Sequence, residues 1–144
     1  MKVFIDANVI IAVLNKEYPL FTWASRVLSL QGKNNITLFT SPLCLAIAFY
    51  FSGKKSGEKP AKKKIEQLCR NMQITTIDEK ITAQAISNPQ VHDFEDGLEY
   101  YSAFNQNCDF IVTENLEDFY FSEIEVLSCE EFLNRLKKTT KKEP

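Results

Sequence analysis

Short apolar runs alternate along this chain with longer segments whose apolar positions repeat every three or four residues. The short runs are rich in β-branched and aromatic residues, which is typical of β-strands. We expect five strands, over residues 2–5, 36–40, 73–77, 109–113 and 124–127. The longer segments indicate helices, because apolar residues at this spacing lie on one helix face. The apolar stripes are Phe21, Ala24 and Leu28; Leu43, Ile47 and Tyr50; Ile65, Leu68 and Met72; and Phe94, Gly97, Leu98, Tyr101 and Phe104.

This alternation predicts a single α/β domain in which helices cover both faces of a parallel sheet. We place the domain at residues 1–138 and a flexible basic tail at residues 139–144. The segment SGKKSGEKPAKKK, at residues 52–64, is predicted to be a flexible insert, because Gly53, Gly57 and Pro60 interrupt the helical pattern.

The composition is that of an ordinary folded domain. With 144 residues, 44% of them hydrophobic, the chain can bury a core without a disulfide or a structural metal. Its four cysteines form no CxxC pair and there is one histidine, so we expect reduced thiols and no zinc site, with Cys44 and Cys69 in the core. Lys2 and Asp6 interrupt the first apolar run, and no apolar stretch approaches the about 20 residues that span a membrane. We therefore expect a cytoplasmic protein without membrane contacts.

The charges are unevenly distributed, although the net charge is only −2. Residues 54–64 carry a net charge of +5, residues 135–143 carry +4, and the rest of the chain carries −11. The basic stretches are either solvated surface or a pair of arms that contact phosphates. The second interpretation predicts nucleic-acid contacts from Lys54, Lys55, Lys62, Lys63 and Lys64.

Four polar side chains follow predicted strands or begin a predicted helix. Asp6 follows the first strand, Asn115 and Asp118 follow the fourth, and Asp96 lies at the start of the helix that leads into the fourth. Each has a structural explanation, because Asp and Asn are favoured N-caps. The three-residue spacings Asp93–Asp96 and Asn115–Asp118 also match a capping box. Considered singly, these residues predict only helix caps.

Their positions together favour a metal site. The residues that follow parallel strands meet at one edge of the sheet, where open α/β sheets bind ligands at the switch point of the strand order. Carboxylates gathered there repel one another unless a cation neutralises them, and Mg²⁺ or Mn²⁺ prefers such hard oxygen ligands. Such an ion promotes phosphodiester hydrolysis. Because His92 is the only histidine, no Ser–His or Cys–His nucleophile is predicted.

The stretches FIDANVII, SPLCLAIAFYF and DFEDGLEYYSAFNQNCDFIVTENLEDF resemble the PIN-domain family of metal-dependent nucleases. Many bacterial members are toxins of VapC-type toxin–antitoxin pairs. The resemblance runs from residue 2 to about residue 133 and is most specific in its last stretch. It implies a three-layer α/β/α fold with a five-stranded parallel sheet in the order 3-2-1-4-5.

The resemblance also implies the roles of individual side chains. Asp6, Asp96 and Asp118 would hold Mg²⁺ or Mn²⁺, and Asn115 would act with them as a catalytic residue. Asn8 and Thr113 resemble the small polar residues that orient these acids in the family. The implied partners are an RNA substrate and a cognate antitoxin, and a homodimer is left open.

Two positions depart from the family pattern. The glutamate that the family often has in the helix after the second strand is Ile47 here, and the arginine that commonly follows the fourth-strand threonine is Glu114. Whether Glu114 compensates for the missing acid is left open. Glu95 and Glu99 are nearby alternatives, although a solvent-facing Glu99 is equally compatible with the sequence.

Three functions are compatible with these residues. The leading one is a Mg²⁺- or Mn²⁺-dependent endoribonuclease, plausibly an antitoxin-restrained toxin. The loss of the acid at Ile47 favours a second, a catalytically degenerate PIN fold that binds RNA or protein. A phosphoacceptor receiver domain is the third and least favoured, because the first strand is followed by Asp6 alone rather than by an acidic pair.

Overall fold

The five strands that the structure describes form one parallel sheet. The computed structural model describes residues 1–142, and the side chains of residues 1–139. Its strand order is β3-β2-β1-β4-β5, and every neighbouring pair is parallel, which confirms the predicted topology. The strands are β1 (Lys2–Ile5), β2 (Thr37–Thr40), β3 (Gln73–Ile74), β4 (Phe110–Val112) and β5 (Glu125–Leu127).

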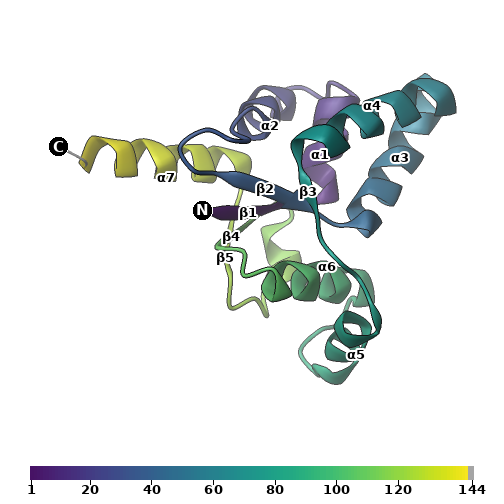
Figure 1. Cartoon of the computed structure of the whole chain (residues 1–144), viewed down its shortest axis with the longest axis vertical. Helices are drawn as coiled ribbons and strands as arrows, with labels where there is room; N and C mark the ends of the chain where they lie inside the picture. Colours follow the sequence, from purple (N-terminus) through teal and green to yellow (C-terminus); the bar gives the residue numbers. More distant parts are fainter. Residues whose placement is uncertain (143–144) are drawn as a thin grey trace.

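Helices cover both faces of this sheet, so the fold has the expected three layers (Figure 1). In the view of Figure 1, helices α1 to α4 lie above the sheet, and α5 and α6 lie below it. Helix α7 packs against α2. The helices are α1 (Ala7–Leu14), α2 (Leu20–Leu28), α3 (Pro42–Ser56), α4 (Glu58–Asn71), α5 (Glu79–Ser87), α6 (Phe94–Asn105), the 3₁₀ helix η1 (Leu116–Phe119) and α7 (Cys129–Lys142).

Strand β1 is the centre of the sheet and fixes its register. Three of its four residues are completely buried, which suits an apolar strand covered on both faces. Ile5 of β1 lies opposite Val112 of β4. The next residues along these strands, Asp6 and Thr113, therefore emerge side by side at the carboxyl edge. This is the point at which the strand order changes direction, because β2 and β4 lie on opposite sides of β1.

Short polar residues begin the helices that leave this edge. Asp6 caps α1 by accepting a hydrogen bond from the backbone N–H of Ala7, and Ser41 caps α3 by accepting from that of Cys44. Asp93 caps α6 in the same way, with Asp96 as donor. Each cap satisfies a backbone donor that the helix itself leaves unpaired.

The predicted flexible insert at residues 52–64 is wrong, because this segment forms the end of α3 and the start of α4. Gly57 joins the two helices with a φ of 91°, a conformation that side chains with a Cβ rarely adopt. Pro60 lies in the first turn of α4, where proline is tolerated. Lysine is a good helix former, so the lysine-rich composition does not prevent a helix.

Other expectations are also changed in detail. Strand β3 ends at Ile74 instead of Ile77. Cys44 is buried as expected, but the prediction of a core position for Cys69 is wrong, because Cys69 is exposed. Helix α7 includes residues 139–142, where the tail was expected to begin, and residues 143–144 lie outside the described residues. Within the described chain, no helix combines the length and the apolar character needed to cross a membrane.

Candidate active site

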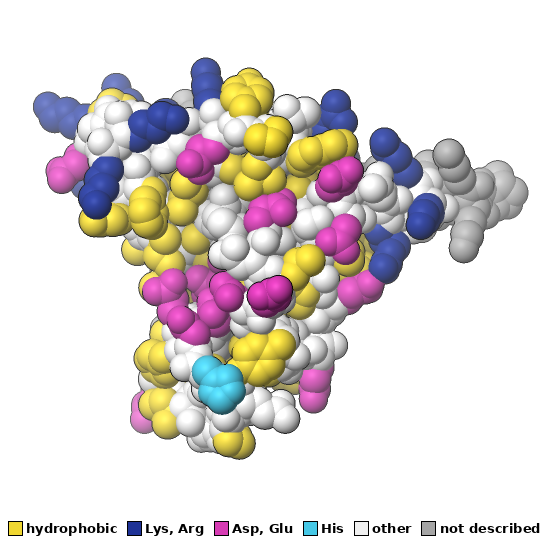
Figure 2. Space-filling model, turned by 180° about the vertical axis from the view of Figure 1, so that it is seen from behind, with side chains coloured by type: hydrophobic (Ala, Val, Ile, Leu, Met, Phe, Trp, Pro, Cys, Tyr) yellow, Lys and Arg dark blue, Asp and Glu magenta, His cyan; other side chains and the backbone are white. Residues whose placement is uncertain are grey.

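The carboxyl edge of the sheet borders a cavity of about 510 Å³, and seven of the fifteen described residues that line it are acidic. Figure 2 shows these acidic side chains gathered in a hollow, with the basic side chains of this face lying away from it. Neither lysine nor arginine is among the lining residues that the structure describes. The acidic residues of the lining are Asp6, Asp93, Glu95, Asp96, Glu99, Glu117 and Asp118.

Asp6 is held in place by hydrogen bonds to both of its carboxylate oxygens. Its Oδ1 atom accepts from the backbone N–H of Ala7 at 2.7 Å. Its Oδ2 atom accepts from the Thr113 hydroxyl at 2.8 Å and from the Asn8 side-chain amide at 3.2 Å. The residue is 7% exposed, so it reaches the cavity while its orientation is fixed by buried partners.

Asn8 and Thr113 also connect the two strand ends to each other. The Asn8 amide donates to the Thr113 hydroxyl at 3.0 Å, and the Asn8 carbonyl oxygen accepts from the backbone N–H of Glu114 at 3.1 Å. The Thr113 hydroxyl further accepts from the backbone N–H of Asn115 at 3.0 Å. The two residues proposed from the sequence to orient the acids thus lie directly against Asp6. They also hold the loop that carries Asn115.

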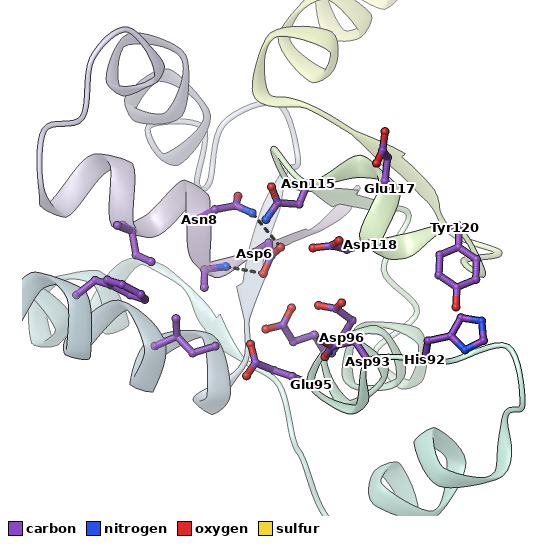
Figure 3. A pocket seen from close by; sticks show the side chains of 15 residues that line it. Asp6, Asn8, His92, Asp93, Glu95, Asp96, Asn115, Glu117, Asp118 and Tyr120 are labelled. Atoms are coloured by element: carbon purple, nitrogen blue, oxygen red, sulfur yellow. Dashed lines mark hydrogen bonds between the residues drawn. The ribbon is translucent and has the colours of Figure 1, made fainter.

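Asp96 and Asp118 approach Asp6 from two other elements, α6 and η1. Figure 3 shows the carboxylates of Asp6, Asp96 and Asp118 directed toward the same central space. Burial raises the pKa of Asp96 to about 7, and the charges of its neighbours, Asp93 first and then Asp118, add to the effect. A carboxyl group with this environment is stabilised when a cation is present. Asn115 lines the same cavity.

Glu99 lies deeper in the cavity and is the residue that the sequence left undecided. It is 2% exposed, so the solvent-facing alternative is wrong. Burial, followed by the charge of Asp6, raises the pKa of Glu99 to about 10. In the described part of the chain, one group of three potential metal-ligating side chains has ligand atoms within 4.8 Å of one another, and it consists of Asp6, Cys44 and Glu99.

The predicted set of Asp6, Asp96 and Asp118 therefore shares one cavity without forming a cluster as close as that of Asp6, Cys44 and Glu99. The spacing of Asp96 and Glu99, three residues apart on one helix, could have indicated that both face the cavity. No sequence spacing relates either of them to Cys44, which reaches Asp6 from α3.

The two departures from the family pattern have different structural outcomes. Ile47 is half-buried and lines the cavity, so α3 presents an apolar side chain there. Glu114 does not face the acidic cavity, since its Oε1 atom accepts a hydrogen bond from the backbone N–H of Cys129, at the start of α7. Glu114 therefore does not compensate for the missing carboxylate at Ile47.

Three of the five lysines considered for nucleic-acid binding have structural partners. The ammonium groups of Lys55 and Lys64 donate to the backbone carbonyls of Asn15 and Leu14, at the C-terminal end of α1. Cations at this end of a helix complement its dipole. The ammonium group of Lys54 lies 4.4 Å from the centre of the Tyr50 ring. Lys62 and Lys63 are exposed on α4.

An aromatic pair forms one side of the cavity mouth. The rings of His92 and Tyr120 are stacked, with centroids 5.6 Å apart and planes inclined by 24° (Figure 3). The Tyr120 hydroxyl donates to the backbone carbonyl of Gln90, which fixes the ring. Sequence analysis did not identify this pair, because the two residues belong to different loops and share no motif.

Comparison with known families and proteins gives a consistent result over most of the chain. The family model described as PIN domain matches residues 2–117. The chain is similar to Ribonuclease VapC1 of Aquifex aeolicus (strain VF5), with 28% identity over 138 residues. That alignment covers 93% of this chain and 94% of the relative.

Solved structures share the fold at lower identity. VapBC2 from Rickettsia felis, bound to a DNA fragment from their promoter, matches with a TM-score of 0.67 and 18% identity, over 89% of this chain and 98% of that chain. VapC20 of Mycobacterium tuberculosis, a sarcin-ricin loop cleaving toxin, matches with a TM-score of 0.61 and 13% identity, over 76% and 86% of the two chains.

Proposed function

This chain belongs to the PIN-domain family, and from that premise we propose that it is a Mg²⁺- or Mn²⁺-dependent endoribonuclease, the toxin of a VapC-type toxin–antitoxin pair. The similarity to Ribonuclease VapC1 over nearly the full length of both chains supports a ribonuclease. The sarcin-ricin loop cleaving toxin among the similar structures supports RNA as the substrate class. The VapBC2 structure supports an antitoxin protein as the partner.

One observation carries the proposal: Asp6 is fixed by Thr113 and Asn8 at the wall of a cavity whose described lining includes seven acidic residues and neither lysine nor arginine. A fold gains nothing from such a concentration of like charges, because each carboxylate raises the cost of ionising the others. A divalent cation offsets this cost. The concentration of charge therefore supports a cation-binding site.

The available donors fit Mg²⁺ or Mn²⁺. They are hard carboxylate and amide oxygens, which these ions prefer, and the open cavity has room for the water molecules that Mg²⁺ usually retains. In the proposed site, Asp6 would hold the ion, with Asp96, Asp118 and Asn115 as the further ligands. The bound ion would lower the pKa of an attacking water and stabilise the oxygen that leaves the phosphorus.

The protein residues position the substrate and the ligands around this chemistry. Thr113 and Asn8 keep the Asp6 carboxylate in one orientation, so that little reorganisation is needed on binding. His92 and Tyr120 offer stacked rings at the mouth of the cavity, and aromatic faces bind unpaired bases of RNA by stacking. The exposed ammonium groups of Lys62 and Lys63 on α4 can contact phosphates.

A catalytically inactive binding module is less well supported. The apolar Ile47 at the cavity wall is the feature that favours it. However, the buried Asp6 with its four hydrogen bonds is retained. A surface that only binds RNA would not need so many uncompensated carboxylates. We therefore favour the enzyme.

The test is cleavage of total bacterial RNA by the purified chain with and without Mn²⁺. We expect cleavage by the wild type in Mn²⁺, and loss of cleavage with EDTA or with Asp6→Asn. The variant should fold, because Asn is as good an N-cap as Asp. Equal cleavage by the wild type and Asp6→Asn would reject the proposed site. RNA binding without cleavage in Mn²⁺ would instead support the binding module.

A further inference from the structure

Glu99 is a buried glutamate whose close polar neighbours, Asp6 and Cys44, bring no positive charge. It lies on α6, one turn after Asp96, and lines the acidic cavity. No hydrogen bond from the described residues reaches its Oε2 atom. Neither of the ion pairs found in the described part of the chain involves it.

A carboxyl group in this position is costly unless something binds it. Burying a polar group without a hydrogen bond destabilises the folded state, and most buried polar atoms are therefore paired. The other carboxylates near the strand ends follow this rule. Asp6 accepts from four donors, and Glu114 accepts from the N–H of Cys129. The acidic cavity lies beside Glu99, so a group that binds the Oε2 atom of Glu99 would lie in this cavity.

The two helices that flank the cavity differ in what they offer to a cation. Helix α3 contributes Ile47 and Phe51 to the lining, and neither has a donor oxygen. Helix α6 contributes Asp96 and Glu99, whose three-residue spacing places both on one helix face. The carboxylates of the cavity are therefore concentrated on the α6 side.

We propose that Glu99 is a direct oxygen ligand of the divalent cation, and that it supplies from α6 the carboxylate that α3 lacks at Ile47. This rests on the proposed function, because it concerns the same cation. The ligand atoms of Glu99 and Asp6 lie within 4.8 Å of each other. Both side chains are therefore within reach of one Mg²⁺, whose opposite ligand oxygens are about 4 Å apart.

Cys44, the third member of this group, is assigned a different role. Its thiol donates to Oδ1 of Asp6 at 3.8 Å. A thiol sulfur is a soft ligand and does not suit Mg²⁺ or Mn²⁺. Burial raises the pKa of the Cys44 thiol, which keeps the proton on the sulfur. Cys44 therefore packs against the carboxylates without binding the cation.

The experiment is a calorimetric titration of the full chain with Mn²⁺ alone. Glu99→Gln, which keeps the shape of the side chain, should weaken Mn²⁺ binding by at least about tenfold. Substituting a residue that only supports a metal ligand already costs about this much affinity, so losing a ligand should cost no less. Glu117→Gln is the matched control, since Glu117 is exposed at the same cavity and points away from the central space (Figure 3). It should change the affinity by less than about threefold, because solvent screens exposed charges.

A second variant tests whether weaker Mn²⁺ binding by Glu99→Gln comes from the lost carboxylate and not from a folding defect. Adding Ile47→Glu to the Glu99→Gln chain should restore Mn²⁺ binding, because it returns one carboxylate to the cavity from the α3 side. Mn²⁺ binding that is lost with Asp6→Asn but unchanged with Glu99→Gln would overturn this inference and leave the proposed function intact. A wild type that binds no Mn²⁺ would overturn both.

Discussion

The hydroxyl of Thr113 lies 2.8 Å from the Oδ2 atom of Asp6, although 107 positions separate the two residues along the chain. The contact is a direct consequence of the β1–β4 register. The backbone N–H of Asp6 donates to the carbonyl of Val112 at 3.0 Å, which extends the ladder by one residue beyond β1. The side chains at the two strand ends then point to the same place. This buried contact of the site is thus built by the sheet itself and not by a loop.

Replacing Thr113 with valine should weaken Mn²⁺ binding without unfolding the protein. Valine has the same shape but cannot donate to Asp6, so the carboxylate keeps only the Asn8 amide on its Oδ2 atom. We expect a loss of about 10- to 100-fold in affinity, the usual effect of removing a residue that orients a metal ligand. Calorimetric titration with Mn²⁺ measures it. Thr113→Ser, which retains the hydroxyl, is the control, and equal affinities for the two variants would contradict the proposed role.

In metal-free solution, the free energy of unfolding should decrease as the pH rises from about 5 to about 9. The pKa values of Asp96 and Glu99 are raised to about 7 and about 10, above their ordinary values. In this pH range the folded protein retains protons that the unfolded chain has released, so a rising pH favours the unfolded chain. The contribution of Asp96 should level off above pH 7, and that of Glu99 should continue toward pH 10. Urea denaturation in EDTA at several pH values checks this.

The Glu99→Gln variant isolates one part of this dependence. Glutamine does not titrate, so the variant should lose less stability between about pH 5 and 9 than the wild type does. The difference in free energy of unfolding between the two proteins should grow with pH. Parallel pH profiles would show that Glu99 is not held protonated in the folded state.

The sequence predicted the sheet and the location of the site well, because both depend on strongly patterned residues. Apolar β1 is buried on both faces. Its position next to β4 follows from the strand order that the resemblance to the PIN-domain family implies. The polar residues after each strand then have only one edge at which to meet. Asp6, Asp96 and Asp118 accordingly line one cavity.

The buried face of α6 was predicted less well. The apolar stripe of this helix includes Phe94 and Phe104, yet these are exposed, whereas Gly97, Glu99 and Ala103 are buried. Small residues face inward because α6 lies close to its neighbours: a Cβ added at Gly97 would come within 2.6 Å of Val91. A pattern based on hydrophobicity favours large side chains and therefore left the orientation of Glu99 undecided. Close packing of this kind becomes visible only with the neighbouring elements in place.

Lys64→Met should reduce stability more than Lys63→Met, although the substitutions are adjacent and remove the same charge. Lys64 donates to the Leu14 carbonyl at the end of α1 at 3.0 Å, whereas Lys63 is exposed. We expect a loss of about 1 kcal/mol for Lys64→Met, the size of a favourable interaction between a cation and a helix C-terminus. Methionine retains the apolar stem, so the comparison reports on the ammonium group. Denaturation midpoints that are the same for both variants would contradict this contact.

The exposed lysines of α4 should affect RNA binding and leave stability unchanged, in contrast to Lys64. Lys62→Gln with Lys63→Gln should leave the melting temperature unchanged and reduce the salt dependence of RNA binding. For single-stranded RNA, removing one lysine–phosphate interaction should lower the slope of log K against log salt concentration by about 0.7. The measurement uses Asp6→Asn protein, which is expected to bind RNA without cleaving it. An unchanged slope would show that these lysines are solvated surface.

Ile47→Glu tests whether the cavity wall on α3 can be returned to an acidic ligand position. Ile47 is half-buried and packs against the core, so the substitution should cost about 1 kcal/mol or more of stability in EDTA, from reduced apolar burial and from repulsion by the seven acids. Mn²⁺ should then raise the melting temperature of the variant by more than it raises that of the wild type, because the added carboxylate faces the cation. Ile47→Gln, which has the same bulk without the charge, should be destabilised without this gain. A melting temperature of Ile47→Glu that falls and does not respond to Mn²⁺ would mean that the new side chain turns into the core, away from Asp6.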